Sequence, residues 1–437
     1  MKKKLSDFFE KVIRASFLVF VFLLPWQTKL IVRPAGNNFN EISFYLSHLV
    51  LFFVLVLFLI YQLLKKEYQE KGIAVWYCLS GLALITFISF FFAPDKVLAF
   101  YRYVIILLGI FLFYFLQQAF RQPVYGEAII EKTKVIFIFL GSVFFHVSLG
   151  IYQFLNQKSF AFKYLGLASH NPEDLGVSVV ETLSGRWLRS YGGFDHPNIF
   201  GGVLVIAIIL ASYLLAKKKL IRTNKEILES IFLFIFYFFA LLALLFTFSR
   251  SAWLALALGF IALFVVFLIK KEKWALGRLA MLFFFSIFLS GIICFSYQDL
   301  FFTRLESNGR LEKISASERS SQLIEAQEVI GEKWLFGTGI GNYTRFLADK
   351  DVSENNLKKA DWEYQPVHNS FLLLWSESGF LALIFLLAFF VSAWKRGHLE
   401  GFAWFLLIPL IVLMLFEHWF ISLPFGIIFL FFIFGLI

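Results

Sequence analysis

Long apolar runs recur along almost the whole chain, and they restrict its fold class more than any other feature. A helix needs about 20 apolar residues to cross the hydrocarbon of a bilayer, and about twelve runs of that length can be recognised. They fall near residues 12–32, 43–64, 72–92, 97–120, 133–155, 197–216, 228–248, 251–269, 276–297, 368–394, 401–417 and 420–437. Pro25 and Lys29 interrupt the first run.

Composition supports a membrane protein. The chain is 59% hydrophobic and contains 61 phenylalanines, which is more apolar surface than one soluble globule buries. We therefore expect an all-α polytopic membrane protein with about 12 transmembrane helices, in which residues 1–437 form a single integral membrane domain.

Two long polar segments separate the apolar runs, at residues 156–196 and 298–367. The second contains Ser315 and Glu318 at the spacing of a capping box, followed by apolar residues at helical intervals. This pattern predicts a short amphipathic helix that begins near Ser315 and ends at Gly331. Such a helix either covers a cavity or only orders the loop.

The basic residues indicate how the chain is oriented in the membrane. The net charge of +10 could suggest a nucleic-acid partner, but the cations gather at alternate ends of the apolar runs, as the positive-inside rule describes. The basic clusters are the amino terminus with Lys2, Lys3, Lys4, Lys11 and Arg14, then Lys65-Lys66, Lys217-Lys218-Lys219, Lys270-Lys271-Lys273 and Lys395-Arg396. We expect both termini to be cytoplasmic and both long segments to face outward. No cleavage site of small residues follows the first run, which therefore reads as a retained helix.

Two arginines lie where apolar runs meet outward-facing loops. Arg189 begins the stretch RSYGGFDHPN, which contains His196 and Asn198 and leads directly into an apolar run. The stretch either forms a functional site or simply turns the chain into a helix. Arg250 lies between two runs, with no acidic residue close in sequence, so an anionic ligand or the phospholipid headgroups would serve as its partner.

A histidine introduces the tenth apolar run, in the stretch HNSFLLLWSESG from His368 to Gly379. Asn369 follows it, and Glu377 lies about two turns further along. Histidine can accept a proton near neutral pH, although a lone histidine at a helix start is more often structural.

Cys78 and Cys294 lie inside apolar runs and indicate neither a disulfide framework nor a metal site. The stretch GTGIGN at 337–342 lacks the βαβ context of a dinucleotide site and reads as a turn.

Taken in order, three of these motifs resemble those of the bacterial O-antigen ligase and polymerase family. An arginine and G-x-F-x-H-P-N are matched from Arg189 to Asn198, R-x-x-x-L by Arg250 and Leu254, and the histidine motif by His368, Asn369 and Gly379. The resemblance spans essentially the whole chain. Ala382 departs from the family's pattern, which has Gly, Thr or Tyr there, and this difference argues against the strict ligase subfamily.

The resemblance implies a GT-C-like fold and a metal-independent, inverting glycosyltransferase at the outer face of the bacterial inner membrane. The donor would be a polyprenyl-diphosphate-linked glycan, and the acceptor a lipid A core or another glycan. By the same resemblance Arg189 and Arg250 would bind the diphosphate and His368 would be the general base. Supporting roles would fall to Arg186, His196, Asn198, Arg319, Asn369, Glu377 and Gly379.

No cofactor and no nucleic-acid partner are expected. Three alternatives remain open at this point. The first is a polysaccharide polymerase or protein O-oligosaccharyltransferase of the same family. The second is a transporter of small anions or solutes, and the third is a protein that only scaffolds an envelope complex.

Overall fold

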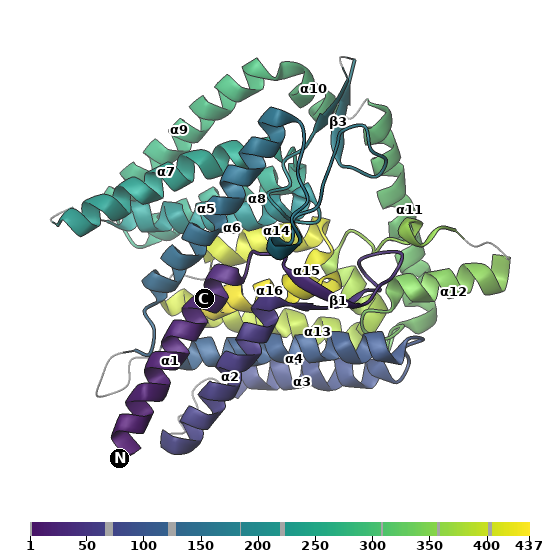
Figure 1. The fold of residues 1–437 in the computed structure, drawn as a ribbon, viewed down its shortest axis with the longest axis horizontal. Helices are drawn as coiled ribbons and strands as arrows, with labels where there is room; N and C mark the ends of the chain where they lie inside the picture. The colour runs from purple at the N-terminus through teal and green to yellow at the C-terminus, as the bar shows by residue number, and fades with distance from the viewer. Residues whose placement is uncertain are drawn as a thin grey trace.

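The computed structural model describes residues 2–65, 73–120, 128–183, 185–218, 223–306, 309–355, 359–400 and 404–437. Within these ranges, eight helices are long and apolar enough to cross a membrane. They are α2 (Leu46–Lys65), α4 (Lys96–Ala119), α5 (Lys132–Asn156), α6 (Pro197–Lys217), α7 (Asn224–Phe246), α8 (Arg250–Ile269), α9 (Lys273–Ser296) and α13 (Ser370–Glu400). Shorter apolar helices are α3 (Ile73–Phe90), α14 (Trp404–Phe416) and α16 (Pro424–Leu436). The expected all-α polytopic membrane protein is confirmed (Figure 1). Lys66 and Lys219, from two of the basic clusters, lie outside the described residues.

The first apolar run is placed differently from its prediction at residues 12–32. Its helix, α1, spans Lys2–Leu23 and ends two residues before Pro25. Proline lacks a backbone N–H and restricts the residue before it, so the helix cannot continue. The β-branched residues beyond it form strand β1 (Lys29–Arg33), which pairs antiparallel with β2 (Ile42–Tyr45).

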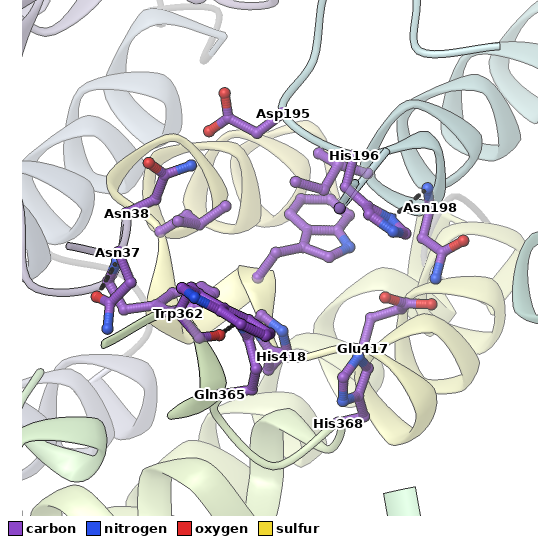
Figure 2. A pocket seen from close by; sticks show the side chains of 15 residues that line it. Asn37, Asn38, Asp195, His196, Asn198, Trp362, Gln365, His368, Glu417 and His418 are labelled. Atoms are coloured by element: carbon purple, nitrogen blue, oxygen red, sulfur yellow. Dashed lines mark hydrogen bonds between the residues drawn. The ribbon is translucent and has the colours of Figure 1, made fainter. Parts of the chain in front are cut away.

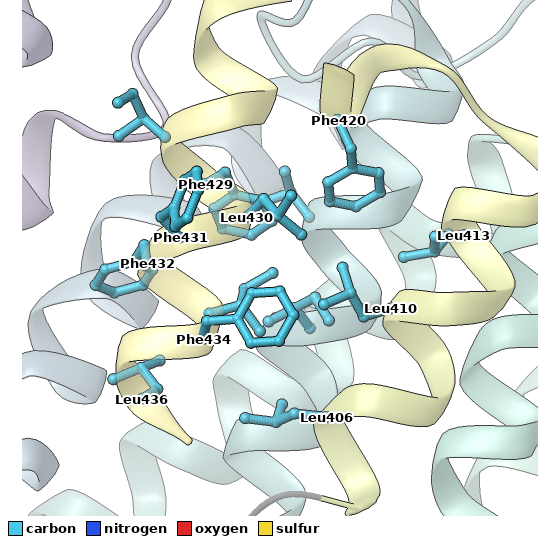
Figure 3. Close-up of a cluster of buried hydrophobic side chains, with 14 of the residues drawn as sticks. Leu406, Leu410, Leu413, Phe420, Phe429, Leu430, Phe431, Phe432, Phe434 and Leu436 are labelled. Atoms are coloured by element: carbon cyan, nitrogen blue, oxygen red, sulfur yellow. The ribbon is translucent and has the colours of Figure 1, made fainter. Parts of the chain in front are cut away.

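The C-terminal helices form the centre of the bundle (Figure 1). Every residue of α16 is buried, and the described part of α6 is buried on nearly all sides. A helix that is apolar all round has no polar face to turn outward, so it is surrounded by other helices. Figure 3 shows Phe429, Phe432 and Phe434 of α16 in this core. Phe429 and Phe432 pack on Phe139 of α5, and Phe434 packs on Phe389 of α13.

The two polar segments contain ordered structure. The first holds η1 (Lys163–Leu165) and the antiparallel strands β3 (Val179–Thr182) and β4 (Gly185–Leu188). The second holds α10 (Gln298–Glu306), α11 (Arg310–Lys333), α12 (Tyr343–Asn355) and η2 (Asp361–Glu363). In Figure 1, α11 and α12 lie at the same end of the molecule as the loop between β1 and β2.

Helix α11 corrects the prediction for the second segment. It begins at Arg310, five residues before Ser315, and passes through Gly331 to Lys333. An interior glycine costs a helix only about 1 kcal/mol, and nearby Ala326 and Val329 are buried and offset that cost. Ser315 and Glu318 are therefore interior helical residues and not a cap.

Candidate active site

Three helices begin at one end of the bundle, and the residues at their starts come together there. His196 is the N-cap of α6, Arg250 begins α8, and His368 lies two residues before α13. Glu417 joins them from the link between α14 and α15 (Trp419–Ser422). Helix N-termini carry partial positive charge, so this end of the bundle favours anions.

Two cavities open at this place. The larger, of about 700 Å³, lies beneath α11, and its cationic lining consists of Arg189, Arg304, Arg319 and Lys359. The smaller, of about 380 Å³, is shown in Figure 2. His196, Asn198 and His368 line both cavities. We call them the arginine cavity and the small cavity.

Arg189 is held rigidly at the wall of the arginine cavity, with only 5% of its surface exposed. Its Nε donates to the carbonyl of Thr247 at 2.7 Å, and its Nη2 donates to Oδ1 of Asn198 at 2.7 Å. Burial, and then the neighbouring Arg304, lower the pKa of Arg189 to about 9. Arg189 therefore remains charged at neutral pH.

Arg304 is a second buried arginine at the same wall, and it was not predicted from the sequence. Its Nε donates to the carbonyl of Phe248 at 2.9 Å, and its Nη1 donates to the carboxylate of Glu312 on α11. The other carboxylate oxygen of Glu312 lies 3.4 Å from Nη2 of Arg250. Glu312 thus bridges two arginines.

This bridge changes the interpretation of Arg250. No acidic residue lies close to Arg250 in the sequence, but the fold brings Glu312 to it from a distant helix. Arg250 is not among the described residues that line either cavity. Its guanidinium contacts the carboxylate of Glu312 and the backbone carbonyl of Arg304.

His368 presents one ring nitrogen to its support and leaves the other available. Its Nδ1 lies 2.6 Å from Oε1 of Gln322 on α11. Because an amide oxygen only accepts hydrogen bonds, Nδ1 carries the proton and donates it. The lone pair is then on Nε2, for which the described residues provide no hydrogen-bond partner. Burial, and then Arg319, lower the pKa of His368 to about 4, so the ring is neutral at pH 7.

His196 differs because both of its nitrogens are engaged. Nδ1 accepts from the backbone N–H of Asn198 at 3.1 Å, so the proton is on Nε2, which donates to Oγ of Ser178 at 2.8 Å. Burial holds the pKa of His196 well below its ordinary value. This histidine caps α6 and has no lone pair left to accept a proton from a ligand.

Two further residues, Glu417 and His418, belong to the site and were missed by the sequence analysis. Glu417 is 3% exposed, and its Oε1 accepts from Oγ of Ser251 at 2.8 Å. Burial raises the pKa of Glu417 to about 7, against the opposing effect of hydrogen bonds from Ser251 and Asn198. The His418 ring packs edge-on against that of His368, with centroids 4.9 Å apart. The sequence signal was an acid and a histidine where the apolar runs 401–417 and 420–437 meet.

Three of the predicted supporting residues make contacts that hold local structure. Asn369 accepts from the N–H groups of Phe371 and Leu372, both at 3.0 Å, and so caps α13. Glu377 accepts from the N–H of Gly341 at 2.8 Å, which fixes the turn that GTGIGN was expected to form. Gly379 has a φ of +83°, and α13 kinks there.

The two predicted supporting arginines, Arg186 and Arg319, differ in whether they reach a cavity. Arg186, on β4, donates to the carbonyl of Glu173 at 3.1 Å and does not line either cavity among the described residues. Arg319 lines the arginine cavity and lowers the pKa of His368. Within the described ranges, no three His, Cys, Asp or Glu side chains are grouped to hold a metal ion.

The comparisons with known proteins agree with the motifs. Residues 235–387, from α7 to α13, match the protein-family model described as O-Antigen ligase. This match confirms the resemblance over residues 235–387 and supports glycan transfer of the ligase or polymerase type at the level of the family. No match was found among curated proteins. Arg304, Arg319 and His368 lie inside the matched range, whereas Arg189 precedes it.

Proposed function

From the O-antigen ligase domain at residues 235–387, we propose that this protein moves a glycan from a polyprenyl-diphosphate donor to a hydroxyl of an acceptor. The acceptor would be a lipid A core or another glycan, and the site would face outward from the bacterial inner membrane. One observation carries the proposal. A cavity of about 700 Å³ joins three arginines, Arg189, Arg304 and Arg319, to a neutral histidine, His368.

The arginines suit a diphosphate. A guanidinium donates two parallel hydrogen bonds to phosphate oxygens and stays charged at neutral pH. The guanidiniums of Arg189 and Arg304 are already fixed by the carbonyls of Thr247 and Phe248, so little conformational freedom is lost when a ligand binds. In the proposed reaction these charges neutralise the leaving diphosphate without a metal ion.

Arg250 has a different position in this scheme. Its contact with Glu312 would hold that carboxylate against Arg304 and so orient the Arg304 guanidinium toward the cavity. That Arg250 itself binds the diphosphate stays a prediction.

His368 is the proposed base. The acceptor hydroxyl oxygen attacks the anomeric carbon, and its proton passes to Nε2 of His368. The bond between the anomeric carbon and the diphosphate oxygen breaks, and the diphosphate leaves with the electron pair. Attack opposite the leaving group inverts the anomeric carbon. Gln322 holds the tautomer that this step needs.

The test is transfer by purified protein in liposomes with a polyprenyl-diphosphate glycan, several acceptors and a chelator. We expect wild-type protein to transfer and His368→Ala to lose transfer. His170→Ala should retain it, because His170 bonds to Ser159 and is not among the residues lining either cavity. Full activity of His368→Ala, or movement of a labelled small anion across the membrane without glycan transfer to any acceptor, would contradict the proposal.

A further inference from the structure

The small cavity shares a wall with the arginine cavity but has a different chemical character. His196, Asn198, Trp362, Gln365 and His368 line both. The rest of its lining includes Asn38, Asp195, Glu417 and His418 (Figure 2). Any molecule in this cavity therefore lies beside the proposed base.

Charge distinguishes the two cavities. The described residues that line the small cavity include neither lysine nor arginine, and they include the carboxyl groups of Asp195 and Glu417. The lining of the arginine cavity contains carboxylates as well, but four cations stand beside them, namely Arg189, Arg304, Arg319 and Lys359. A diphosphate therefore finds counter-charges in the arginine cavity, whereas the described lining of the small cavity provides none.

Several polar groups of the small cavity are free to bind a ligand. Asn38 and Asp195 are exposed, and no hydrogen bond joins their side chains to other described residues. Gln365 donates its amide N–H to the carbonyl of Trp362 at 2.6 Å, which leaves its own amide oxygen available. These groups combine donors and acceptors, as a ring with many hydroxyls requires.

Trp362 supplies an apolar surface to the same cavity. Its side chain is 67% exposed, and in Figure 2 its indole lies across the cavity from Asp195 and His196. An indole offers a large flat face with a polar edge. Such a face suits the C–H side of a sugar ring, while Asn38 and Asp195 suit its hydroxyls.

The loop that carries Asn38 is anchored beside Trp362. Nδ2 of Asn37 donates to the carbonyl of Asp361 at 2.9 Å, and its Oδ1 accepts from the N–H groups of Phe39 and Asn40. The β1–β2 loop and the η2 segment are thus joined across more than 300 residues of chain. This link keeps Asn38 and Trp362 on one cavity wall.

We infer that the small cavity is the acceptor subsite and that it selects a sugar carrying no phosphate or other anionic group. The inference rests on the proposed function. Asn38 and Asp195 bind hydroxyls of that sugar, Trp362 packs on its face, and the reacting hydroxyl lies toward Nε2 of His368. A phosphate on the same sugar would meet Asp195 and Glu417 without any cation.

The first experiment compares a neutral acceptor saccharide with the same saccharide bearing a phosphate on a non-reacting hydroxyl. We expect transfer to the neutral form at a kcat/KM at least about tenfold higher, corresponding to about 1.4 kcal/mol of discrimination. Asp195→Arg should narrow this ratio by improving the phosphorylated acceptor. Equal use of both acceptors by wild-type protein would overturn the inference.

The second experiment measures substrate KM in variants. Asn38→Ala, Asp195→Asn and Trp362→Ala should each raise KM for the acceptor by about fivefold to tenfold, from the loss of one contact. Asn38→Ala and Asp195→Asn should leave KM for the donor unchanged, because neither residue lines the arginine cavity. Trp334→Ala is the matched control, because Trp334 is exposed and lies outside the linings of both cavities. Unchanged acceptor KM in all three variants would refute the subsite while leaving the proposed transferase intact.

Binding without turnover separates the two proposals. Saturation-transfer NMR with the neutral saccharide and protein in nanodiscs reports the subsite even if no transfer is detected. We expect a signal that Trp362→Ala weakens and Trp334→Ala preserves. A signal that is unchanged in both Trp362→Ala and Asp195→Asn would contradict the assignment of this cavity.

Discussion

Replacing Gln322 with glutamate tests the proposed base most directly. In the wild-type protein the amide oxygen of Gln322 accepts from Nδ1 of His368 at 2.6 Å, and the pKa of the histidine is about 4. Gln322→Glu keeps the shape and the acceptor but adds a negative charge beside the imidazole. The charge stabilises the imidazolium, so His368 should become a stronger base.

The size of the effect follows from electrostatics. Two unit charges about 4 Å apart interact by about 4 kcal/mol at an effective dielectric constant near 20, and 1.36 kcal/mol corresponds to about one pH unit. The buried position of Gln322 makes the new carboxylate costly to ionise, which reduces the net effect. We therefore expect the acid limb of kcat/KM to move upward by about one to three pH units.

The assay is glycan transfer in proteoliposomes between pH 4 and 8. The wild-type rate should persist to well below pH 6, because His368 is protonated only near pH 4. In Gln322→Glu, the fall of kcat/KM on the acidic side of the pH profile should occur closer to neutral pH. Gln327→Glu adds the same charge to an exposed position of α11 and should leave the profile unchanged.

A second substitution removes the support without adding charge. Gln322→Leu deprives Nδ1–H of its acceptor, at a cost of about 1 to 3 kcal/mol, so kcat should fall roughly tenfold to a hundredfold.

If the pH profile of Gln322→Glu superimposes on the wild-type profile, His368 is not the titrating base and the reasoning is refuted.

Three further predictions concern stability. Glu312→Gln leaves the guanidiniums of Arg304 and Arg250 without their carboxylate, so thermal unfolding in detergent should show a loss of roughly 3 kcal/mol; an unchanged midpoint would contradict the bridge. Gly379→Ala places a Cβ 1.9 Å from the carbonyl oxygen of Leu335 at a φ of +83°, and should cost at least about 2 kcal/mol, whereas Gly331→Ala meets open space and should be neutral or stabilising. Burial raises the pKa of Glu417 to about 7, so the folded protein holds this proton more tightly than the unfolded chain. The contribution to stability is present below pH 4.5 and is lost as the pH rises through 7, by about 3 kcal/mol. Glu417→Gln should not show this loss of stability at rising pH. If the free energies of unfolding of the variant and the wild type differ by a constant amount from pH 4.5 to 8, Glu417 does not contribute in this way.

The helices could be predicted because their signal is local. An apolar run of sufficient length specifies a spanning helix whatever surrounds it, and the run predicted near residues 197–216 corresponds to α6. The start of α11 was missed because the capping-box spacing at Ser315 also occurs inside helices, where no free N–H groups remain to be capped. Arg310 and Glu312 upstream gave no sign of their helical conformation.

The site could be predicted only in part, because pairing and burial depend on residues far apart in the chain. The motifs identified Arg189 and His368, which the fold brings to one cavity. Glu312 and Gln322 looked like ordinary polar residues of an outer loop, and only the packing of α11 over the bundle places them against Arg304 and His368. Glu377 was predicted as a supporting residue because it is an acid within an apolar run. Its carboxylate accepts from the N–H of Gly341 and so fixes a backbone turn, a contact that the sequence did not indicate.

The central position of α14 and α16 has a consequence for biosynthesis. The helices that surround them, among them α4, α6, α8 and α13, are synthesised earlier and must leave the middle of the bundle open until residues 404–437 follow. Glu417 and His418 arrive with these later helices. A nascent chain that has inserted only the helices up to α13 therefore has neither a filled interior nor a full set of site residues, and residues 404–437 supply both together.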